Sequence, residues 1–310
     1  MRSLFAWGKL LLLTNRPLPF FVVTLFAGLT VQAGVSDDFN DGNDAGWTHY
    51  NPIGTGLWSV SGGAYRLQSG PSPSPATIGP GRAGSLRTTE TYSQFSASVD
   101  IVGWDNSLDQ IFGLITRVTT PGAGTTKGYG FTYATRTGRA TTGQLQILLI
   151  AQEAGTDIVP AVNFTFVAGQ SYRMVFEGVL DSLTAKLYST TNLLTPLATL
   201  TTSNTTYTSG GVGFFTYDNS RTGAGRADVT FDNFASEELG PKLQIARDIT
   251  STDIFLSWPN WATTYRLERS YTCGPFDWVD LGVGFDQFDG KFIMFDDGTL
   301  PFAFYRLVTP

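Results

Sequence analysis

The densest group of side chains with metal-binding chemistry lies in the stretch SDDFNDGNDAGWTHYNP, residues 36–52. Its aspartates and asparagines carry the hard oxygen atoms that Ca²⁺ prefers as ligands. Asp38 belongs to this opening stretch, and Asp232 belongs to the strand-like segment VTFDNF near the end of the same region. If the two segments pair, both carboxylates can bind one structural Ca²⁺. The alternative is that the acidic residues only end a strand and form a turn, for which Asp and Asn are favoured.

The sequence lacks the usual combinations of catalytic side chains. A glycosidase needs two carboxylates close together, whereas no two glutamates stand at alternate positions of one strand-like segment. A serine nucleophile, or Cys273 as nucleophile, would need an imidazole base, and His49 is the single histidine. Whether the protein is an enzyme stays open, with the balance against catalysis and no catalytic residue assigned.

Aromatic and polar side chains at the ends of three strand-like segments are suited to sugar binding. Sugar rings stack their apolar faces on Trp and Tyr, while Asp and Asn hydrogen-bond to the hydroxyl groups. The alternative is that these aromatic residues belong to the core and that the Asp-Asn pairs form turns. The predicted ligand-binding residues are Trp104, Asp105, Tyr133, Tyr217, Asp218 and Asn219.

The segments that must position these side chains read as β-strands. Apolar and polar residues alternate with period two, which is typical of half-buried strands, and turn-forming residues separate the segments. No segment keeps a helical period for long. Many short strands with polar turns predict an all-β sandwich or barrel. The segments of the first part of the chain are 58–68, 95–104, 129–135, 144–152, 171–178, 183–189, 210–217 and 227–236.

The first 33 residues have the features of a secretory signal peptide. Arg2, Lys9 and Arg16 are followed by an apolar run at 18–31 and by small residues before Gly34. We therefore expect a secreted protein, extracellular or periplasmic, that is not inserted in a membrane once the signal is removed. The net charge of −6 without a basic cluster disfavours nucleic acid as a partner.

A domain boundary is predicted near residue 238. The segment SEELGPK, 236–242, is polar and ends in Gly-Pro, which suits an exposed linker. After it, a second set of short strand-like segments predicts a small C-terminal β-sandwich. The predicted organisation is a signal peptide at 1–33, a first domain at 34–238 and a second domain at 239–310.

Five segments resemble, in their order, the concanavalin A-like lectin/glucanase (laminin-G-like) jelly-roll domains of exported bacterial proteins. They are DDFNDGNDAGW (37–47), WSVSGGAYRL (58–67), LTAKLYSTTNLLTPLATLTT (183–202), GGVGFFTYD (210–218) and ADVTFDNF (227–234). The resemblance implies a jelly-roll β-sandwich of two antiparallel sheets, often with a structural Ca²⁺ where the first and last strands meet. The segments YRLERS (265–270) and FYRL (304–307) resemble a fibronectin type III-like module.

The function implied by the resemblance is carbohydrate binding by an exported, non-catalytic, lectin-like module. Its partner would be a polysaccharide, a cell-surface glycan or a matrix component. One alternative is a glycan-active enzyme, either a glycoside hydrolase or one similar to the 3-keto-glycoside hydrolases, whose opening Gly46-Trp47 and Trp58-Ser59-Val60 match. The other alternative is a purely structural surface protein.

Overall fold

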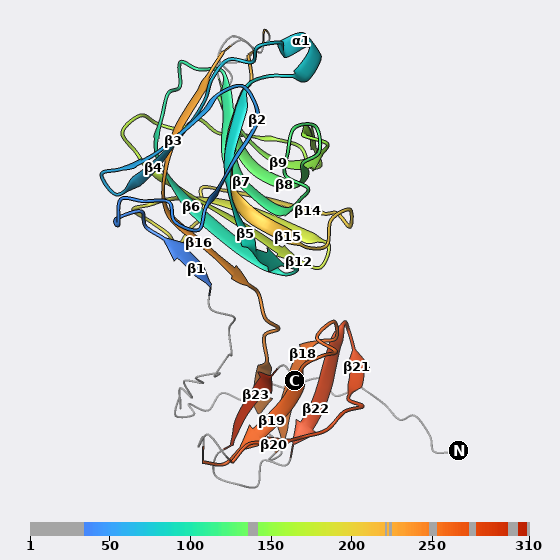
Figure 1. Ribbon diagram of the computed structural model, residues 1–310. Coiled ribbons are helices and arrows are strands. Elements are labelled where there is room, and N and C mark those ends of the chain that lie inside the picture. Colours follow the sequence, from blue (N-terminus) through green and yellow to red (C-terminus); the bar gives the residue numbers. More distant parts are fainter. Residues whose placement is uncertain are drawn as a thin grey trace. The chain divides into compact units, whose positions relative to one another are not determined.

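The computed structural model describes residues 34–135, 142–220, 222, 225–247, 253–272, 277–296 and 303–308. The predicted signal peptide and Cys273 lie outside the described residues. The chain divides into two compact units, one within Thr30–Pro241 and one within Lys242–Pro310, and strands dominate both (Figure 1). None of the helices in the described ranges is long and apolar enough to cross a membrane.

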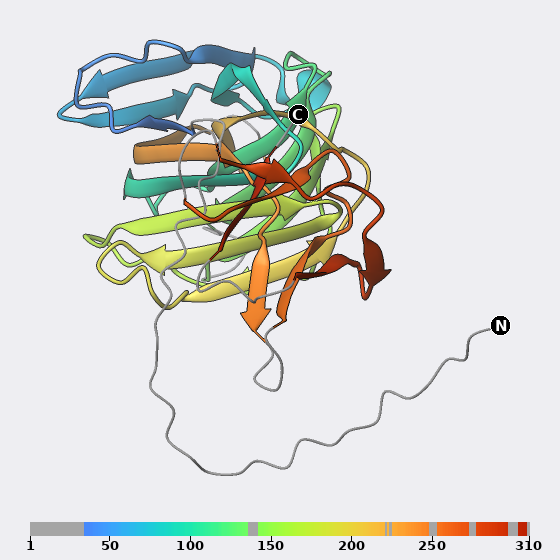
Figure 2. The same ribbon diagram turned by 90° about the horizontal axis from the view of Figure 1, so that it is seen from below.

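One antiparallel sheet of the larger unit, sheet A, has eight strands in the order β14-β13-β12-β6-β16-β4-β3, with β1 paired to β16. Figure 2 shows the orange β16 between the blue β4 and the teal β6, so the last strand of this unit lies in the middle of the sheet. The bounds are β1 (Val35–Asp37), β3 (Gly56–Ser61), β4 (Ala64–Ser69), β6 (Phe95–Trp104), β12 (Tyr172–Val179), β13 (Ser182–Ser189), β14 (Ala198–Ser203) and β16 (Ala227–Glu238).

The other antiparallel sheet, sheet B, also has eight strands, in the order β10-β9-β8-β7-β15-β5-β2, with β11 paired to β9. The bounds are β2 (Thr48–Ile53), β5 (Arg82–Tyr92), β7 (Gln110–Thr119), β8 (Lys127–Ala134), β9 (Gln144–Ala151), β10 (Ala154–Asp157), β11 (Val162–Asn163) and β15 (Gly210–Asp218). A single turn of helix, α1 (Pro75–Ile78), precedes β5. The larger unit is therefore a jelly-roll β-sandwich, which confirms the predicted fold class.

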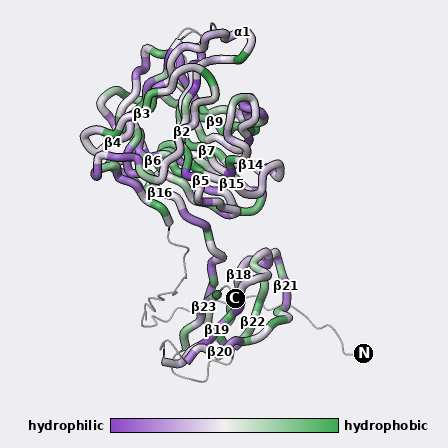
Figure 3. The backbone as a smooth tube through the Cα atoms, viewed as in Figure 1, coloured by the Kyte–Doolittle hydropathy of each residue, from purple (hydrophilic) through white to green (hydrophobic). Residues whose placement is uncertain are grey.

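The main core of this unit contains side chains from both sheets. Alternate residues of β12 are buried, and Figure 3 shows hydrophobic and hydrophilic residues alternating along the strands. Phe214 of sheet B stacks on Phe231 of sheet A with ring centroids 4.4 Å apart. Trp47 packs on the same Phe214 at 4.6 Å, and its indole nitrogen donates a hydrogen bond to Asp37 at 2.7 Å. The opening stretch is thereby anchored in the core through Trp47.

The predicted segments correspond to observed strands, and β6 has the predicted bounds. Two long strands, β5 and β7, were not predicted, and neither were the shorter β2, β10, β11 and β14. The reason is clearest for β7, whose residues Gln110 to Val118 are all buried, so that it lacks the alternation of a half-exposed strand. Residues 62 and 63, both glycines with positive φ, form the turn that divides segment 58–68 into β3 and β4.

The smaller unit forms two small antiparallel sheets, which confirms the predicted C-terminal β-sandwich. Their strand orders are β17-β18-β22-β21 and β20-β19-β23. Trp258, Leu267 and Leu307 are buried in its core. The bounds are β17 (Gln244–Arg247), β18 (Ile254–Pro259), β19 (Arg266–Ser270), β20 (Val279–Asp280), β21 (Asp286–Phe288), β22 (Lys291–Asp296) and β23 (Phe304–Val308).

Candidate ligand-binding groove

A groove of about 390 Å³ lies on the outer face of sheet B. Leu114 of β7, Ile147 of β9 and Phe214 of β15 are buried in the main core. Because side chains alternate along a strand, the residue that follows each of them points to the opposite face of the sheet. These next residues form a second apolar cluster, which is the floor of the groove. The floor residues that line the groove are Ile115, Leu148, Ile150 and Phe215.

Three aromatic side chains line this groove. Phe215 and Tyr217 lie two residues apart on β15, with ring planes 5° apart and centroids 6.2 Å apart. Tyr50 comes from the neighbouring edge of the sheet, where its ring lies directly over Gly84. A Cβ atom at Gly84 would be 2.6 Å from Tyr50 Cδ1, so only glycine leaves room for this ring. The groove thus combines an aliphatic floor with rings that offer flat apolar surfaces.

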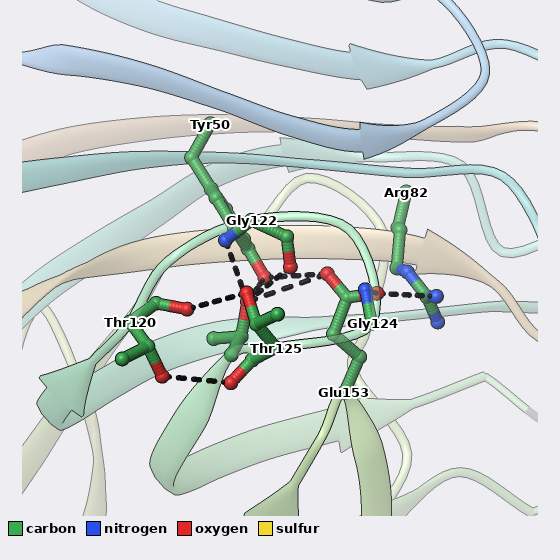
Figure 4. A network of polar contacts seen from close by, with 8 residues as sticks. Tyr50, Arg82, Thr120, Gly122, Gly124, Thr125 and Glu153 are labelled. Carbon is green, nitrogen blue, oxygen red and sulfur yellow. Dashed lines mark hydrogen bonds and ion pairs between the residues drawn. The ribbon is translucent and has the colours of Figure 1, made fainter.

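A buried carboxylate, Glu153, organises the polar side of the groove (Figure 4). Its Oε2 atom accepts hydrogen bonds from Arg82 Nη2 and from the backbone nitrogen of Gly124, both at 2.7 Å. Its Oε1 atom accepts from the Tyr50 hydroxyl at 3.0 Å and from Thr126 Oγ1 at 3.3 Å. Only 2% of the Glu153 side chain is exposed. Glu153 therefore joins strand β2, the start of β5 and the β7–β8 loop at one point.

The backbone holds Glu153 in this position through a tight hairpin between β9 and β10. Gln152 and Glu153 form its two-residue turn, and both have positive φ, 50° and 67°. Non-glycine residues rarely adopt this conformation, so surrounding contacts must stabilise it. The Glu153 backbone nitrogen donates to the Thr126 carbonyl at 2.9 Å, which ties the turn to the β7–β8 loop.

Tyr50 serves this network as a neutral hydrogen-bond donor. Burial raises the pKa of the Tyr50 hydroxyl above its ordinary value, and the negative charge of Glu153 opposes its ionisation further. The hydroxyl also contacts Thr126 Oγ1. Among the described residues that line the groove, Glu153 is the one carboxylate. The arrangement can bind a ligand with an apolar face, while its polar groups bond mainly to one another.

Of the predicted ligand-binding residues, Tyr217 lies in this groove. Asp218 does not: 1% of it is exposed, and its carboxylate accepts hydrogen bonds from Ser220 N at 2.9 Å and Gly225 N at 2.8 Å. Asp218 thus closes the loop after β15 from inside, and its role as a ligand contact stays a prediction. Asn219, half-buried, donates to Asp109 Oδ1 at 2.9 Å.

Tyr133 belongs to the core, and the partly buried Trp104 packs against it, while ligand binding by the two residues stays a prediction. The Tyr133 ring, 1% exposed, stacks on Phe166 with centroids 3.8 Å apart, and its hydroxyl accepts a hydrogen bond from Phe166 N. The half-buried Trp104 packs against the same ring at 5.2 Å. Asp105 is exposed and accepts from Ser107 N at 2.8 Å, which is turn chemistry.

The three predicted loops nevertheless meet at one end of the sandwich, around the buried Gln110. Its side-chain nitrogen donates to the Asp105 carbonyl at 2.8 Å, and its backbone nitrogen donates to Thr135 Oγ1 at 2.8 Å. Gln110 also pairs with Asp218 across β7 and β15. The three loops therefore converge, but Tyr133 and Asp218 point inward.

The opening and closing strands pair, as the calcium prediction assumed. Asp37 of β1 is opposite Phe234 of β16, which places Asp38 and Asp232 near one another. Burial raises the pKa of Asp232, and the carboxylates of Asp100 and Asp38 raise it further. Asp100 itself pairs with Arg173 through two hydrogen bonds of 2.6 and 2.8 Å.

The donor set around Asp38 and Asp232 supplies only part of a calcium site. Ca²⁺ takes six to eight oxygen ligands. Within the described ranges, no group of three or more Asp, Glu, His or Cys side chains could hold a metal ion. Asp38 is exposed and accepts a hydrogen bond from the backbone nitrogen of Asn40, as in an Asx turn. Calcium binding at these two residues stays a prediction.

Four residues of the groove were not predicted from the sequence: Tyr50, Arg82, Glu153 and Phe215. Tyr50 and Glu153 are 103 residues apart in sequence, and Arg82 and Glu153 are 71 apart. A glutamate in a hairpin turn has the same local sequence signal whether it is solvated or buried. Phe215 lies in the predicted segment 210–217, but alternation does not say which of its faces has a groove.

No family model and no curated protein matches this sequence. Solved structures are similar at low identity. Lectin II from Ulex europaeus is 13% identical with a TM-score of 0.48, over 68% of this chain and 100% of that chain. Carbohydrate binding module CBM66 from Bacillus subtilis is 17% identical with a TM-score of 0.44, over 63% and 98%. The β-glucanase of Bacillus licheniformis is 17% identical with a TM-score of 0.45, over 67% and 98%.

Proposed function

We propose that the groove on the outer face of sheet B binds a saccharide. The observation that carries the proposal is the combination of three aromatic rings, Tyr50, Phe215 and Tyr217, with an aliphatic floor and a few polar groups at its side. Sugar rings present a face of C–H groups that packs on aromatic side chains, and specificity comes from a small number of polar contacts. The partner would be a polysaccharide or a cell-surface glycan.

The binding proposal is tested by replacing Tyr217 with alanine. We expect saccharide affinity to fall about tenfold, because one ring–sugar contact is worth about 1 kcal/mol and neighbouring contacts also loosen. A glycan array identifies the ligand, and titration calorimetry measures its affinity. Leu194→Ala is the matched control, since Leu194 is almost fully exposed between β13 and β14 of sheet A. No binding to any carbohydrate, or equal affinity of both variants, would contradict the proposal.

Catalysis on a glycan is the second candidate, and the same groove decides it. A two-carboxylate mechanism needs a partner for Glu153 at about 5 to 9.5 Å. Among the described residues, the groove lining offers no second carboxylate, and Glu153 is already paired with Arg82. These observations favour binding over turnover. Release of reducing sugar by the wild-type chain, lost in Glu153→Gln, would favour the enzyme instead.

The remaining assignments are also proposals. We propose that residues 1–33 direct export to an extracellular or periplasmic location. We propose further that the smaller unit is a fibronectin type III-like module that serves as a spacer or contact domain. The support for the second is its two small antiparallel sheets of four and three strands. Cleavage before Gly34 in the exported protein, read by N-terminal sequencing, would test the first.

Calcium is proposed at Asp38 and Asp232, because a divalent cation would offset the burial and the carboxylate repulsion that together raise the pKa of Asp232. The folded-state pKa of Asp232 lies above its unfolded value. Its ionised form therefore destabilises the fold at neutral pH, and this penalty vanishes as the pH falls below the unfolded value. With chelator at neutral pH, Asp232→Asn should raise the thermal midpoint, and near pH 3 it should have little effect.

Added Ca²⁺ should raise the midpoint of the wild-type protein by a few degrees through mass action. The same addition should leave Asp232→Asn and Asp38→Asn unchanged. Differential scanning calorimetry with and without chelator measures both effects. A wild-type thermal midpoint that does not change with Ca²⁺ would contradict calcium binding. The pH dependence of the Asp232→Asn midpoint tests the electrostatic argument independently.

A further inference from the structure

Internal donors take up most of the acceptor capacity of Glu153 on the polar side of the groove, so little is left for sugar hydroxyls. A carboxylate offers about four lone-pair positions. On Glu153, Arg82 and Gly124 bond to Oε2 and Tyr50 bonds to Oε1, while the one proton of Thr126 Oγ1 is shared between Oε1 at 3.3 Å and the Gly122 carbonyl at 3.1 Å. A neutral sugar that displaced one of these internal donors would leave a buried polar group unpaired.

Donors, in contrast, remain free on the same side. Arg82 bonds to Glu153 through Nη2, and its Nε atom is buried without a partner in the described structure, so the donors left for a ligand are the remaining N–H groups of Nη1 and Nη2. With 18% of its side chain exposed, Arg82 lines the groove and reaches solvent there. A guanidinium that donates one of its five N–H groups to a protein carboxylate can still donate another to an acceptor on a ligand.

A second cation lies beside the groove. An adjoining hollow of about 320 Å³ is lined by Lys127 together with Gln152, and Gln152 also lines the groove itself. Lys127 is exposed, and its ammonium forms no ion pair with the described residues. Two cations thus face one carboxylate across the two hollows, whose described linings hold no other acid. This local positive charge stands out on a chain whose net charge is −6.

We infer that the saccharide bound in the groove is acidic, a uronic acid unit whose carboxylate binds Arg82 with Lys127 nearby, while its ring packs on Tyr217. The inference rests on the proposed function and names the ligand class of the same site. The planar carboxylate of a uronic acid matches the fork of a guanidinium, and this pairing is strengthened by the apolar floor, which lowers the local dielectric. A hydroxyl-only sugar gains neither effect.

The test compares ligands that differ only in charge. Oligogalacturonides and their fully methyl-esterified forms share one backbone, and alginate oligomers provide a second uronic acid series. Titration calorimetry with the full chain at low salt should give at least about tenfold tighter binding for an acid than for its neutral ester, because a charge-assisted hydrogen bond is lost in the ester. The acid's affinity should fall as salt is added, whereas the ester's should not.

Lys127→Gln is the variant of choice because Lys127 is exposed and its replacement leaves the Glu153 network intact. It should weaken acid binding about two- to fivefold at low salt and leave ester binding unchanged, as expected for one partly screened charge. Arg82→Lys should weaken acid binding further, with folding checked by circular dichroism.

The outcomes separate this inference from the proposed function. Equal affinity of acid and ester, with loss of both in Tyr217→Ala, would overturn the acidic ligand and keep saccharide binding. Binding confined to neutral or sulfated saccharides would also overturn the uronic acid. Absence of binding to every acidic and neutral saccharide would overturn both proposals.

Discussion

Replacing Arg117 by alanine is expected to lower the free energy of unfolding by about 3–5 kcal/mol. Arg117 is 2% exposed and forms no ion pair with a carboxylate in the described part of the chain; it donates to backbone carbonyls instead. Nε and Nη2 bond to Ser93 O at 3.2 and 2.6 Å, Nη1 bonds to Tyr207 O at 2.9 Å, and Nη2 bonds to Leu180 O at 2.9 Å. Alanine would remove four hydrogen bonds to the part-buried carbonyls of three turns, together with the packing of a buried side chain. Water that reaches these carbonyls offsets part of the loss.

The position of Arg117 explains the size of this effect. Ser93 lies between β5 and β6, Leu180 between β12 and β13, and Tyr207 between β14 and β15, so one side chain joins three turns. The guanidinium also lies over the Phe95 ring, 5.3 Å from its centroid. Burial lowers the pKa of Arg117, but an arginine keeps its charge at any pH at which the protein folds.

Urea unfolding followed by tryptophan fluorescence measures the loss, with the slope of the transition as a check on cooperativity. Arg66→Ala is the control, because Arg66 is about half exposed and its pair with Asp228 lies at the surface. The control should cost less than about 1 kcal/mol. If both variants lose the same stability, the bonds from Arg117 to the three carbonyls contribute no more than a surface ion pair.

Replacing Glu153 by alanine is expected to cost about 3–5 kcal/mol and to abolish saccharide binding. The substitution removes the partner of Arg82 and leaves the Tyr50 hydroxyl and the Gly124 nitrogen without their acceptor. The β7–β8 loop and the Tyr50 ring then lose the contact that holds them beside the groove. Both losses have one cause, since the same carboxylate supports the fold and positions the lining residues.

Urea unfolding and calorimetric titration measure the two losses, and amide hydrogen exchange at Gly124 should accelerate. Glu177→Ala is the matched control, because Glu177 pairs with Lys186 at the surface, with each side chain about one-third exposed. Glu153→Gln keeps an acceptor of the same shape and should recover part of the stability. If the Gly124 amide of Glu153→Ala exchanged at the same rate as in the wild-type protein, Glu153 would not hold the β7–β8 loop.

Local sequence patterns predicted most of the sandwich. Strand β6 has the bounds that alternation indicated, and β12 and β13 differ from the prediction by one residue. Strand β7 was not predicted because the apolar cluster that contains Ile115 and Leu148 covers its outer face as well. A strand that is covered on both faces has no polar face to mark it.

The site could be predicted in small part. Tyr217 was identified because a tyrosine at a strand end next to Asp and Asn suits sugar binding, and it does line the groove. The same criterion predicted Tyr133 as a ligand-binding residue, yet its ring is stacked inside the core. Burial decides between the two, and burial depends on which strands and loops cover each face.

The amino-acid sequence alone determined the local conformation: period-two alternation and turn residues specify strands and tight turns, because they depend on side chains a few positions apart. Only the tertiary structure decided which strands are neighbours, and with it the site. Residues that are distant in the chain, Tyr50, Arg82, Glu153 and Tyr217, meet on one face of sheet B because strand pairing brings their backbones together. A pattern that repeats every two residues indicates that a strand has two different faces. Packing decides which face meets the core and which can receive a ligand.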